Sequence, residues 1–496
     1  MKPRFVMSLD QGTSGSTCIV FDEHFQTVGR AYHEVACHYP QQGWVSQDPE
    51  ELWTASLITM RRALKNAGIE AGEVAALGIT NQRETTIVWE KATGKPVHEA
   101  IVWQCRRTAP LVEEYAARGL GEMVAERTGL LLDAYFSASK IAWILKSHPE
   151  IRPAAERGEL LFGTVDTWLL WNMTGGATHA TEPSNAARTM LYNIHTMEWD
   201  AELLSAFDIP RAMLPEVKST VGPFGKLDKQ WLGAEIPILG IAGDQQAALF
   251  GHACFNPGDV KNTYGTGCFL VMNVGEKPIN SKHKLLTTVA WQIDGRVNYA
   301  LEGSVFSAGS AVQWLRDSLG VIKNSAETEA LALSLPDNEG VYFVPAFSGL
   351  GAPHWDPYAL GAVYGLTRGA GCAHLARAVL EAAAYQTCEV LKAMQEDCRA
   401  SMSSLRVDGG MSANNFLMQF QADMLNLPVE RPLVIEATAK GAASLAGMGA
   451  GLCDWRSLEE SQAIERVFRP SLDEARRLRY LGEWQEAIRR TLSGRR

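Results

Sequence analysis

The sequence lacks the cysteine pattern of a disulfide-stabilised or zinc-binding protein. Its nine cysteines are scattered over 496 residues, and no two of them form a C-x-x-C pair. Such spacing fits reduced thiols that fill a core better than a disulfide framework or a structural zinc site. His33-Glu34 and His38 are also too widely spaced for the H-E-x-x-H helix of a zinc protease.

Long apolar runs and an excess of basic residues are absent as well. Only a short apolar segment separates Arg4 from Asp10, which is too brief for a signal-peptide core, and no uncharged run is long enough to span a bilayer. The formal net charge of −10 argues against a general binder of nucleic acid or anionic membranes. We therefore expect a cytoplasmic protein that inserts into no membrane, binds no nucleic acid and acts on small molecules.

Several common catalytic motifs are missing. The sequence has no G-x-x-x-x-G-K-[ST] phosphate loop, no protein-kinase G-x-G-x-x-G and no G-x-S-x-G nucleophile elbow. Long internal repeats and low-complexity segments are absent too. If the protein handles a nucleotide, it does so with a different loop.

The length predicts two domains. A chain of 496 residues exceeds the size at which single cores stop growing, roughly 250–300 residues. The apolar and charged fractions are those of an ordinary globular protein. We place the boundary near the middle of the chain, so that residues 1–245 form one domain and residues 246–496 the other.

Each half begins with a similar turn between apolar strands. In the first half, residues 5–9 lead into Asp10-Gln11-Gly12-Thr13-Ser14-Gly15-Ser16 and return through residues 17–21. In the second half, Lys261-Asn262-Thr263-Tyr264-Gly265-Thr266-Gly267 lies between apolar runs. Turns of this composition can expose backbone N–H groups to phosphate, although ordinary hairpins also use them. Two such turns suggest paired domains that hold one phosphate chain, with Asp10 placed to hold a cation.

Asp244 is the acid best placed for chemistry. It follows the apolar strand expected over residues 236–241 and opens a helix-like segment. Open α/β sheets collect ligands at the carboxyl ends of their strands. The alternative is that Asp244 is a plain helix N-cap, a role that Asp commonly fills.

A dense polar insert interrupts two strands that should be buried. Thr80-Asn81-Gln82-Arg83-Glu84-Thr85-Thr86 separates residues 74–79 from residues 87–89. Polar groups in such a place need partners, and a hydroxyl-rich substrate would supply them. Glu84 could accept from hydroxyls and Arg83 could donate to them; a surface ion pair is the alternative.

Aromatic residues and glycines mark further candidate positions. Trp103 ends a short strand and could lie against a small carbon skeleton, although core packing explains it equally well. Tyr135 is a loop aromatic before a helix. Gly409-Gly410 follow the strand at residues 405–408, where bare backbone could approach a flat ligand such as a purine. The small-residue run at 441–453 reads as a buried helix and not as a membrane segment.

Five segments together resemble the FGGY carbohydrate kinases over nearly the whole chain. They are Asn81-Gln82-Arg83-Glu84-Thr85-Thr86, Trp103-Gln104-Cys105-Arg106-Arg107, Gly163-Thr164-Val165-Asp166-Thr167, Gly243-Asp244-Gln245-Gln246-Ala247-Ala248 and Asn262-Thr263-Tyr264-Gly265-Thr266-Gly267. The phosphate turns are shared with the wider actin and hexokinase superfamily. The Arg83-Glu84, Trp103 and Asp244-Gln245 motifs resemble those of the members that phosphorylate glycerol.

The resemblance implies a fold and a reaction. The fold is α/β, with two actin/hexokinase-like, ribonuclease H-like domains whose mixed sheets flank a central cleft. The reaction is the ATP-dependent phosphorylation of glycerol to sn-glycerol 3-phosphate, in glycerol uptake and catabolism, with Mg²⁺ as cofactor. The glycerol site falls in residues 1–245 and the adenosine site in residues 246–496. The resemblance also implies a homo-oligomer, either a dimer or a tetramer.

The resemblance assigns roles to individual residues. Asp244 becomes the general base, and Asp10 orders Mg²⁺ through water. The residues that surround glycerol are Arg83, Glu84, Trp103, Tyr135, Asp244 and Gln245. The residues that bind the nucleotide are Thr13, Ser14, Thr266, Gly309, Gln313, Gly410 and Asn414.

Three stretches depart from the family pattern. Gly15-Ser16-Thr17 stands where the family usually has Ser-Ser-Arg, so a hydroxyl and a phosphate-binding guanidinium are missing. Lys440 replaces an apolar residue, and we expect it at the surface. In a loop through which some members are inhibited by fructose 1,6-bisphosphate, Glu235 occupies the position of an arginine.

Two other functions remain open. The chain could be a kinase for another polyol or sugar, or a non-catalytic actin-like ATPase whose nucleotide state controls a partner. Production of ADP that depends on glycerol would distinguish a glycerol kinase from both alternatives.

Overall fold

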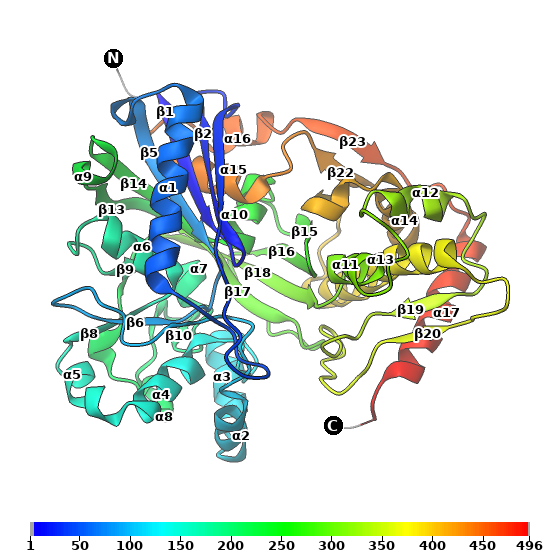
Figure 1. Ribbon diagram of the computed structural model, residues 1–496, viewed down its shortest axis with the longest axis horizontal. Helices are drawn as coiled ribbons and strands as arrows, with labels where there is room; N and C mark the ends of the chain where they lie inside the picture. Colours follow the sequence, from blue (N-terminus) through cyan, green and yellow to red (C-terminus); the bar gives the residue numbers. More distant parts are fainter. Residues whose placement is uncertain (1–3, 495–496) are drawn as a thin grey trace.

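The computed structural model describes residues 4–494 of the chain, which form two lobes, each built on one large mixed sheet. Residues 1–3 and 495–496, at the outer ends of the two expected domains, lie outside the described residues. The first lobe carries the blue strands of Figure 1, and the second carries the yellow and red elements. The α/β fold class with mixed sheets is confirmed.

The sheet of the first lobe has six strands in the order β13-β14-β5-β1-β2-β3. Strands β1, β5 and β14 are parallel neighbours, while β2, β3 and β13 pair antiparallel. The strands are β1 (Phe5–Gln11), β2 (Gly15–Phe21), β3 (Thr27–Glu34), β5 (Val74–Asn81), β13 (Val221–Leu227) and β14 (Ile236–Gly243).

The sheet of the second lobe has seven strands in the order β17-β18-β16-β15-β21-β22-β23. In this sheet β15 pairs antiparallel with β16, its hairpin partner, and parallel with β21. The first sheet has the same arrangement, because β1 pairs antiparallel with β2 and parallel with β5. The strands are β15 (Val260–Tyr264), β16 (Cys268–Gly275), β17 (Leu286–Ile293), β18 (Arg296–Val305), β21 (Leu405–Asp408), β22 (Val429–Pro432) and β23 (Ile464–Phe468). Both predicted hairpins are therefore confirmed, and their role in binding phosphate stays a prediction.

Helices cover both sheets. Asp48 caps α1, where it accepts from Glu50 N at 2.9 Å, and the Pro49 ring suits the first helical position. The helices of at least eight residues are α1 (Pro49–Ala67), α2 (Ala109–Ala117), α3 (Leu120–Thr128), α4 (Ser137–Ser147), α6 (Val165–Met173), α10 (Asp244–Gly251), α11 (Gly309–Asp317), α13 (Cys372–Cys398), α14 (Asn415–Leu425), α15 (Ala437–Gly449) and α17 (Glu474–Thr491). Among residues 4–494, none is long and apolar enough to cross a membrane.

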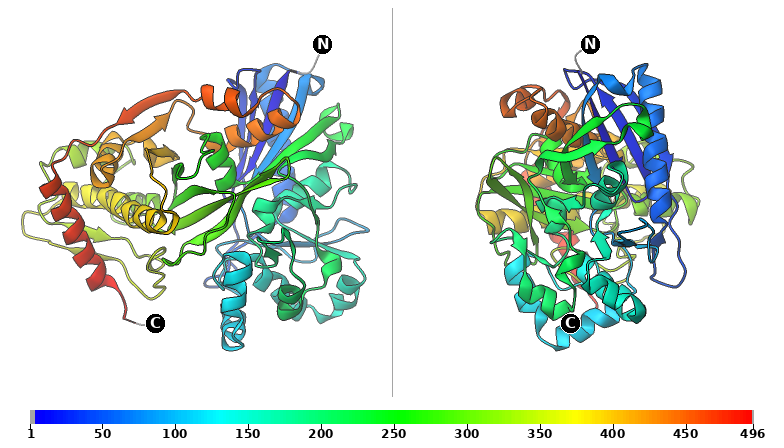
Figure 2. Two further views of the ribbon diagram at one scale, coloured as in Figure 1. Left: turned by 180° about the vertical axis from the view of Figure 1, so that it is seen from behind. Right: turned by 90° about the vertical axis from the view of Figure 1, so that its left-hand side faces the viewer.

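Shorter elements complete the two lobes. Figure 2 shows the insertion that carries α2 to α5 and α8 below the first sheet, away from α15 and α16. The short helices are α5 (Arg152–Glu156), α7 (Pro183–Ala186), α8 (Ala201–Phe207), α9 (Lys229–Leu232), α12 (Glu327–Leu333) and α16 (Trp455–Glu460). The short strands are β4 (Ser46–Gln47), β6 (Ile87–Glu90), β7 (Ala100–Ile101), β8 (Leu160–Gly163), β9 (Ala180–Thr181), β10 (Tyr192–Asn193), β11 (Glu198–Trp199), β12 (Glu216–Val217), β19 (Tyr342–Val344) and β20 (Ala362–Tyr364).

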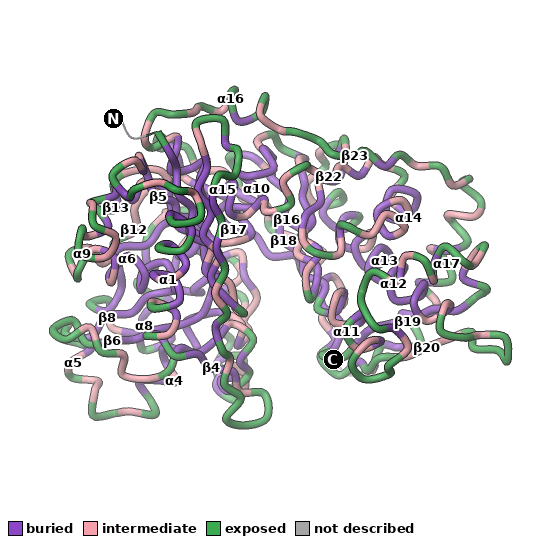
Figure 3. The backbone as a smooth tube through the Cα atoms, turned by 45° about the horizontal axis from the view of Figure 1, so that its top comes forward, coloured by how far each residue is buried: buried purple, intermediate pink, exposed green. Residues whose placement is uncertain are grey.

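Two helices, α10 and α15, join the lobes. Figure 3 shows them among the buried parts of the chain, and α15 also packs on β1, β5 and β14 of the first sheet. Glycines make this possible: a Cβ on Gly441 would lie 1.8 Å from Ala247 O, and one on Gly251 would lie 2.0 Å from Ala437 O. The prediction of a buried helix over residues 441–453 is confirmed for residues 441–447, whereas the helix ends at Gly449 and residues 450–453 lie outside it.

Gly441→Ala is expected to destabilise the protein by about 1–3 kcal/mol, the usual cost of overpacking a tight contact. The added methyl group would meet backbone, which cannot rotate away. Gly482→Ala is the matched control, because Gly482 lies inside α17 with no atom within 4 Å of its would-be Cβ. Chemical unfolding should show Gly482→Ala to be neutral or stabilising by up to about 1 kcal/mol. Equal stabilities of the two variants would contradict the close helix contact.

Candidate active site

Three parallel strands bring the predicted acids to one edge of the first sheet. Gln11, next to Asp10, pairs in register with Asn81 of β5, and Asn81 pairs with Gly243 of β14. Asp10, the polar insert after β5 and Asp244 therefore all lie at the carboxyl ends of neighbouring strands. This is the place at which open sheets bind ligands.

Asp244 is the first residue of α10 and is not its N-cap. The cap position is Gly243, and one Asp244 oxygen, Oδ1, accepts from Gln245 N at 2.7 Å. Arg83 Nε lies 3.1 Å from the same oxygen, and the Asp244 side chain stays 30% exposed. The carboxylate is thus held in one orientation but remains open to a substrate.

Arg83 and Glu84 belong to a buried network of charges. Glu302 Oε2 lies 2.5 Å from Arg83 Nη1, and Glu302 Oε1 lies 3.0 Å from Arg188 Nη2. Arg188 Nε lies 2.6 Å from Glu84 Oε1, whereas Arg83 and Glu84 are 4.0 Å apart. All four side chains are at most 2% exposed, so the alternative of a surface ion pair is wrong.

The pKa values of the two glutamates of the network are shifted in opposite directions. Burial raises the pKa of Glu302, but Arg188 and Arg83 outweigh it and lower that pKa to about 2. At Glu84 burial is the larger influence and raises the pKa, despite Arg188 and Arg83. Glu84 also adopts a φ of +60°, a costly backbone conformation for glutamate that often marks a functional site. The arginines therefore stabilise the ionised form of Glu302 more than burial destabilises it. At Glu84 they offset only part of the effect of burial.

Aromatic rings border the same edge. Trp103 and Tyr135 are half-buried, with ring centroids 5.6 Å apart in an edge-to-face contact. The ring centroid of Phe269, on β16, lies 6.2 Å from that of Trp103. Trp103 Nε1 donates to Thr13 Oγ1 at 2.8 Å, which ties this wall to the first phosphate hairpin. The site thus combines charged groups with an apolar wall, as a small polyol requires.

Lys261 fixes the orientation of Gln245. The Lys261 side chain is fully buried and donates to Gln245 Oε1, to Thr263 Oγ1 at 2.8 Å and to Phe269 O at 3.2 Å. Because lysine only donates, the amide oxygen of Gln245 must face Lys261. The amide nitrogen then faces Asp244 Oδ2, at 3.2 Å.

Candidate nucleotide residues gather around the second hairpin. Ala308 N donates to Thr266 O at 2.9 Å, and Gly309 N donates to Gly265 O at 3.0 Å. A Cβ on Gly309 would lie 2.5 Å from Gly265 O, so the chain can approach only as glycine. A Cβ on Gly409, which precedes the exposed Gly410, would likewise lie 2.5 Å from Tyr264 O. Thr266, Gly309 and Gly410 are therefore brought together.

The other nucleotide candidates lie in the turn of the first hairpin, on α11 one turn after Gly309, and directly before α14. Thr13 and Ser14 form the turn of the first hairpin, half-buried and exposed respectively. Gln313 is exposed on α11. Asn414 caps α14, accepting from Leu417 N at 2.9 Å, and donates to Thr328 Oγ1 at 3.2 Å. Both ends of the Asn414 amide thus already have a hydrogen-bond partner within the protein. A role for Asn414 in nucleotide binding stays a prediction.

Asp10 and Asp244 form a pair of like charges. Burial first, and the charge of Asp244 second, raise the pKa of Asp10 to about 7. Among residues 4–494 no cluster of three or more His, Cys, Asp or Glu could hold a metal alone. Two carboxylates do fit Mg²⁺, which proteins typically bind through one or two carboxylates, water and substrate phosphates.

Two departures from the family pattern have structural consequences. Lys440 is only 7% exposed, so the prediction of a surface lysine is wrong; the first turn of α15 is covered by residues that are distant in sequence. Gly15 lies against Tyr32, whose Oη would be 2.5 Å from a Cβ there. The backbone oxygen of His33 would be 2.6 Å from the same Cβ, so a serine at position 15 would require both Tyr32 and the backbone of β3 to move.

Sequence reasoning missed four residues of the site: Arg188, Lys261, Phe269 and Glu302. Glu302 carried a signal, since a lone carboxylate inside the apolar strand β18 needs a buried partner. The strand and loop patterns gave no indication that Arg188 would be that partner, because 114 residues separate the two.

Comparisons with known proteins agree over the full length. The profile of the FGGY family of carbohydrate kinases matches residues 5–251 with its N-terminal domain and residues 260–450 with its C-terminal domain. The chain is 56% identical over 492 residues to glycerol kinase 2 of Thermotoga maritima, covering 99% of each chain. It is also 56% identical over 493 residues to a glycerol kinase of Halorhodospira halophila, covering 99% of this chain and 97% of that one.

Solved structures share the fold. Plasmodium falciparum glycerol kinase with ADP superimposes with a TM-score of 0.91 at 36% identity, covering 98% of each chain. A gluconate kinase of Lactobacillus acidophilus has a TM-score of 0.89 at 20% identity, covering 99% of this chain and 98% of that one. At that identity the second likeness concerns the fold alone.

Proposed function

The chain belongs to the FGGY family of carbohydrate kinases, and from this premise we propose that it transfers the γ-phosphoryl group of ATP to glycerol, giving sn-glycerol 3-phosphate and ADP. The observation that carries the proposal is the partly exposed Asp244 carboxylate, held by Arg83 beside the aromatic wall of Trp103 and Tyr135. A charged group able to accept a proton next to an apolar face suits the hydroxyls and carbon skeleton of glycerol.

In the proposed mechanism Asp244 is the general base. Its exposed carboxylate accepts the proton of the attacking hydroxyl, while Arg83 and Gln245 keep it oriented. Glu84 accepts from a second hydroxyl, and Trp103 and Tyr135 exclude water from the carbon skeleton. Positioning of this kind supplies much of the rate in phosphoryl transfer.

ATP is held between the two hairpins in this proposal. Thr13, Ser14 and Thr266 contact the phosphates, and Gly309, Gln313, Gly410 and Asn414 contact the remainder of the nucleotide. Asp10, ordering Mg²⁺ through water, would place it near Asp244; when bound, the ion neutralises phosphate charge. The elevated pKa of Asp10, caused by its burial and by Asp244, supports a cation at this position.

In this proposal the two substrate sites belong to different parts of the chain. We assign the glycerol site and first hairpin to residues 1–245, and the second hairpin and adenosine site to residues 246–496. We further propose a cytoplasmic homo-oligomer, a dimer or tetramer, that acts in glycerol uptake and catabolism; the support is the family resemblance.

The test of the proposal is the initial rate of ADP release from MgATP with a panel of acceptors. We expect glycerol to give the highest kcat/KM. A pentulose that outperformed glycerol would instead indicate a sugar kinase, and an unchanged rate without any acceptor would indicate an actin-like ATPase.

Fructose 1,6-bisphosphate is expected to leave the rate unchanged up to millimolar concentrations. Glu235 carries a negative charge where an inhibited relative would have an arginine, and it repels phosphate. Glu235 Oε2 also lies 2.8 Å from Lys226 Nζ, which occupies a cation that might otherwise substitute. The measurement is the initial rate against bisphosphate at subsaturating glycerol. Inhibition that disappears in Glu235→Ala would contradict this interpretation of the loop.

A further inference from the structure

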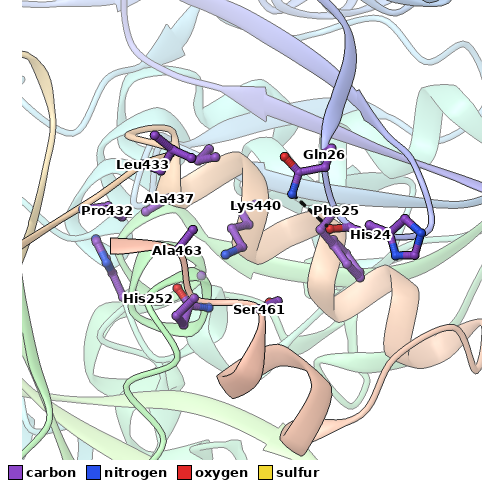
Figure 4. Close-up of a pocket in the computed structure, with 13 residues that line it drawn as sticks. His24, Phe25, Gln26, His252, Pro432, Leu433, Ala437, Lys440, Ser461 and Ala463 are labelled. Carbon is purple, nitrogen blue, oxygen red and sulfur yellow. Dashed lines mark hydrogen bonds between the residues drawn. The ribbon is translucent and has the colours of Figure 1, made fainter. Parts of the chain in front are cut away.

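Lys440 points into a small pocket that is separate from the proposed active site. Figure 4 shows its amine directed into the space between α15, the turn after β2 and the segment before β23. Gln26 and Phe25 come from the turn, His252 from the end of α10, and Ser461 from the segment before β23. The pocket thus collects residues from both lobes.

The register of the first hairpin places this pocket away from the reacting groups. Asp10 lies near the turn of the β1–β2 hairpin, where Gln11 pairs with Ser16. Phe25 and Gln26 follow the opposite end of β2, where Phe21 pairs with Val6. The pocket is therefore at the other edge of the sheet from Asp10, and a ligand there would be no part of the glycerol site.

The charge of Lys440 has no counter-ion in the described part of the chain. The residue is 7% exposed, and no hydrogen bond or ion pair reaches its amine among residues 4–494. The nearby acid Glu436 is engaged by Arg30, at 2.8 Å. Burial lowers the pKa of Lys440 to about 8, so the amine is still mainly protonated at neutral pH. An ammonium group that has no protein partner and only the pocket through which to reach water is costly to leave uncompensated, and an anion in the pocket would compensate it.

The surroundings of the amine add to the positive potential. Lys440 lies in the first turn of α15, whose unpaired backbone N–H groups and helix dipole favour negative charge. No side chain caps this helix. None of the 13 described residues that line the pocket is acidic. Gln26 uses one amide N–H toward His24 O, at 3.4 Å, and keeps a second for a ligand.

We propose that this pocket binds a small inorganic anion of halide size, with the Lys440 ammonium as its counter-ion. The pocket opens to solvent, and the space within it is about 20 Å³, which is sufficient for one species of about the size of a water molecule or a chloride ion. A larger anion such as methanesulfonate would have to project from the pocket toward solvent, away from most of these groups. Because α15 joins both lobes, an ion at its first turn stabilises the junction of the two lobes.

Thermal unfolding at constant ionic strength is the first test. Replacing sodium methanesulfonate by sodium chloride or bromide should raise the Tm of the wild-type protein by roughly 1–3 °C, through binding to the folded state. Lys440→Met should abolish the difference between salts. Lys277→Met, at an exposed lysine outside the pocket, should retain it. A Lys440→Met protein with the wild-type difference would overturn the proposal.

Anomalous diffraction from crystals grown in sodium bromide provides the second test. We expect a bromide peak within hydrogen-bonding distance of Lys440 Nζ in the wild-type protein and none in Lys440→Met. Absence of the peak from the wild-type pocket would overturn the proposal even if Lys440→Met failed to fold. Neither test depends on glycerol kinase activity, so the outcome is independent of the proposed function.

Discussion

Asp244→Asn is expected to lower kcat by at least about a hundredfold while leaving ATP binding close to that of the wild-type protein. A positioned general base contributes on the order of 10²–10⁴ to a rate. Asparagine preserves the shape of the side chain and its contact with Gln245 N, but it cannot take the proton of the attacking hydroxyl. The nucleotide candidates around Thr266, Gly309 and Gly410 do not contact Asp244, so binding of ATP should survive.

The measurement combines steady-state kinetics with nucleotide titration. Asp294→Asn is the matched control, because Asp294 is exposed in the turn between β17 and β18 and contacts no residue of the site. Its kcat should equal that of the wild-type protein. A near-wild-type kcat in Asp244→Asn would remove Asp244 from the mechanism.

Glu302→Gln is expected to destabilise the fold by about 3–5 kcal/mol, the usual cost of leaving a buried charge without its partner. Glu302 is fully buried and compensates both Arg83 and Arg188, which are themselves nearly inaccessible to water. Glutamine keeps the volume but removes the negative charge. Arg83 then loses its closest anion and the support that aims it at Asp244, and Arg188 keeps only Glu84 as an anionic partner.

The pH dependence of stability identifies the same group. The pKa of Glu302 falls from an ordinary 4.5 to about 2 in the folded protein, since Arg188 and Arg83 outweigh burial. Its contribution is therefore fully present above about pH 4.5 and is lost as the pH falls toward 2. Glu302→Gln should lose this part of the acid dependence.

Chemical unfolding between pH 3 and 7 measures both effects. Glu460→Gln is the control, because Glu460 makes only an exposed ion pair with Arg456. Such surface pairs contribute little to stability, so this variant should behave like the wild-type protein. If Glu302→Gln were as stable as Glu460→Gln at pH 7, the buried network would not hold the site together.

Much of the fold could be predicted because the signals are local. The turns after Leu9 and after Tyr264 carry their own glycines and hydroxyls, and each lies between apolar strands. Asp10 and Asp244 each follow a strand, and the rule for parallel sheets brings such positions together. The capping of α1 by Asp48 depends only on neighbouring residues.

The remainder of the site depends on contacts between distant segments. Glu302 and Arg188 meet only when β18 of the second sheet lies against the insertion of the first lobe. The sequence predicts Lys440 at the surface, because helix periodicity does not reveal which distant residues cover the first turn of α15. The charge of a residue indicates that it needs a partner, but the sequence does not indicate which one.

The most direct test of the account is the identity of the product, followed by ³¹P NMR with MgATP and glycerol. We expect sn-glycerol 3-phosphate to appear in equal amounts with ADP in the wild-type protein, and neither to appear at a comparable rate in Asp244→Asn or without glycerol. Formation of ADP and free phosphate at the same rate with and without glycerol would contradict the account.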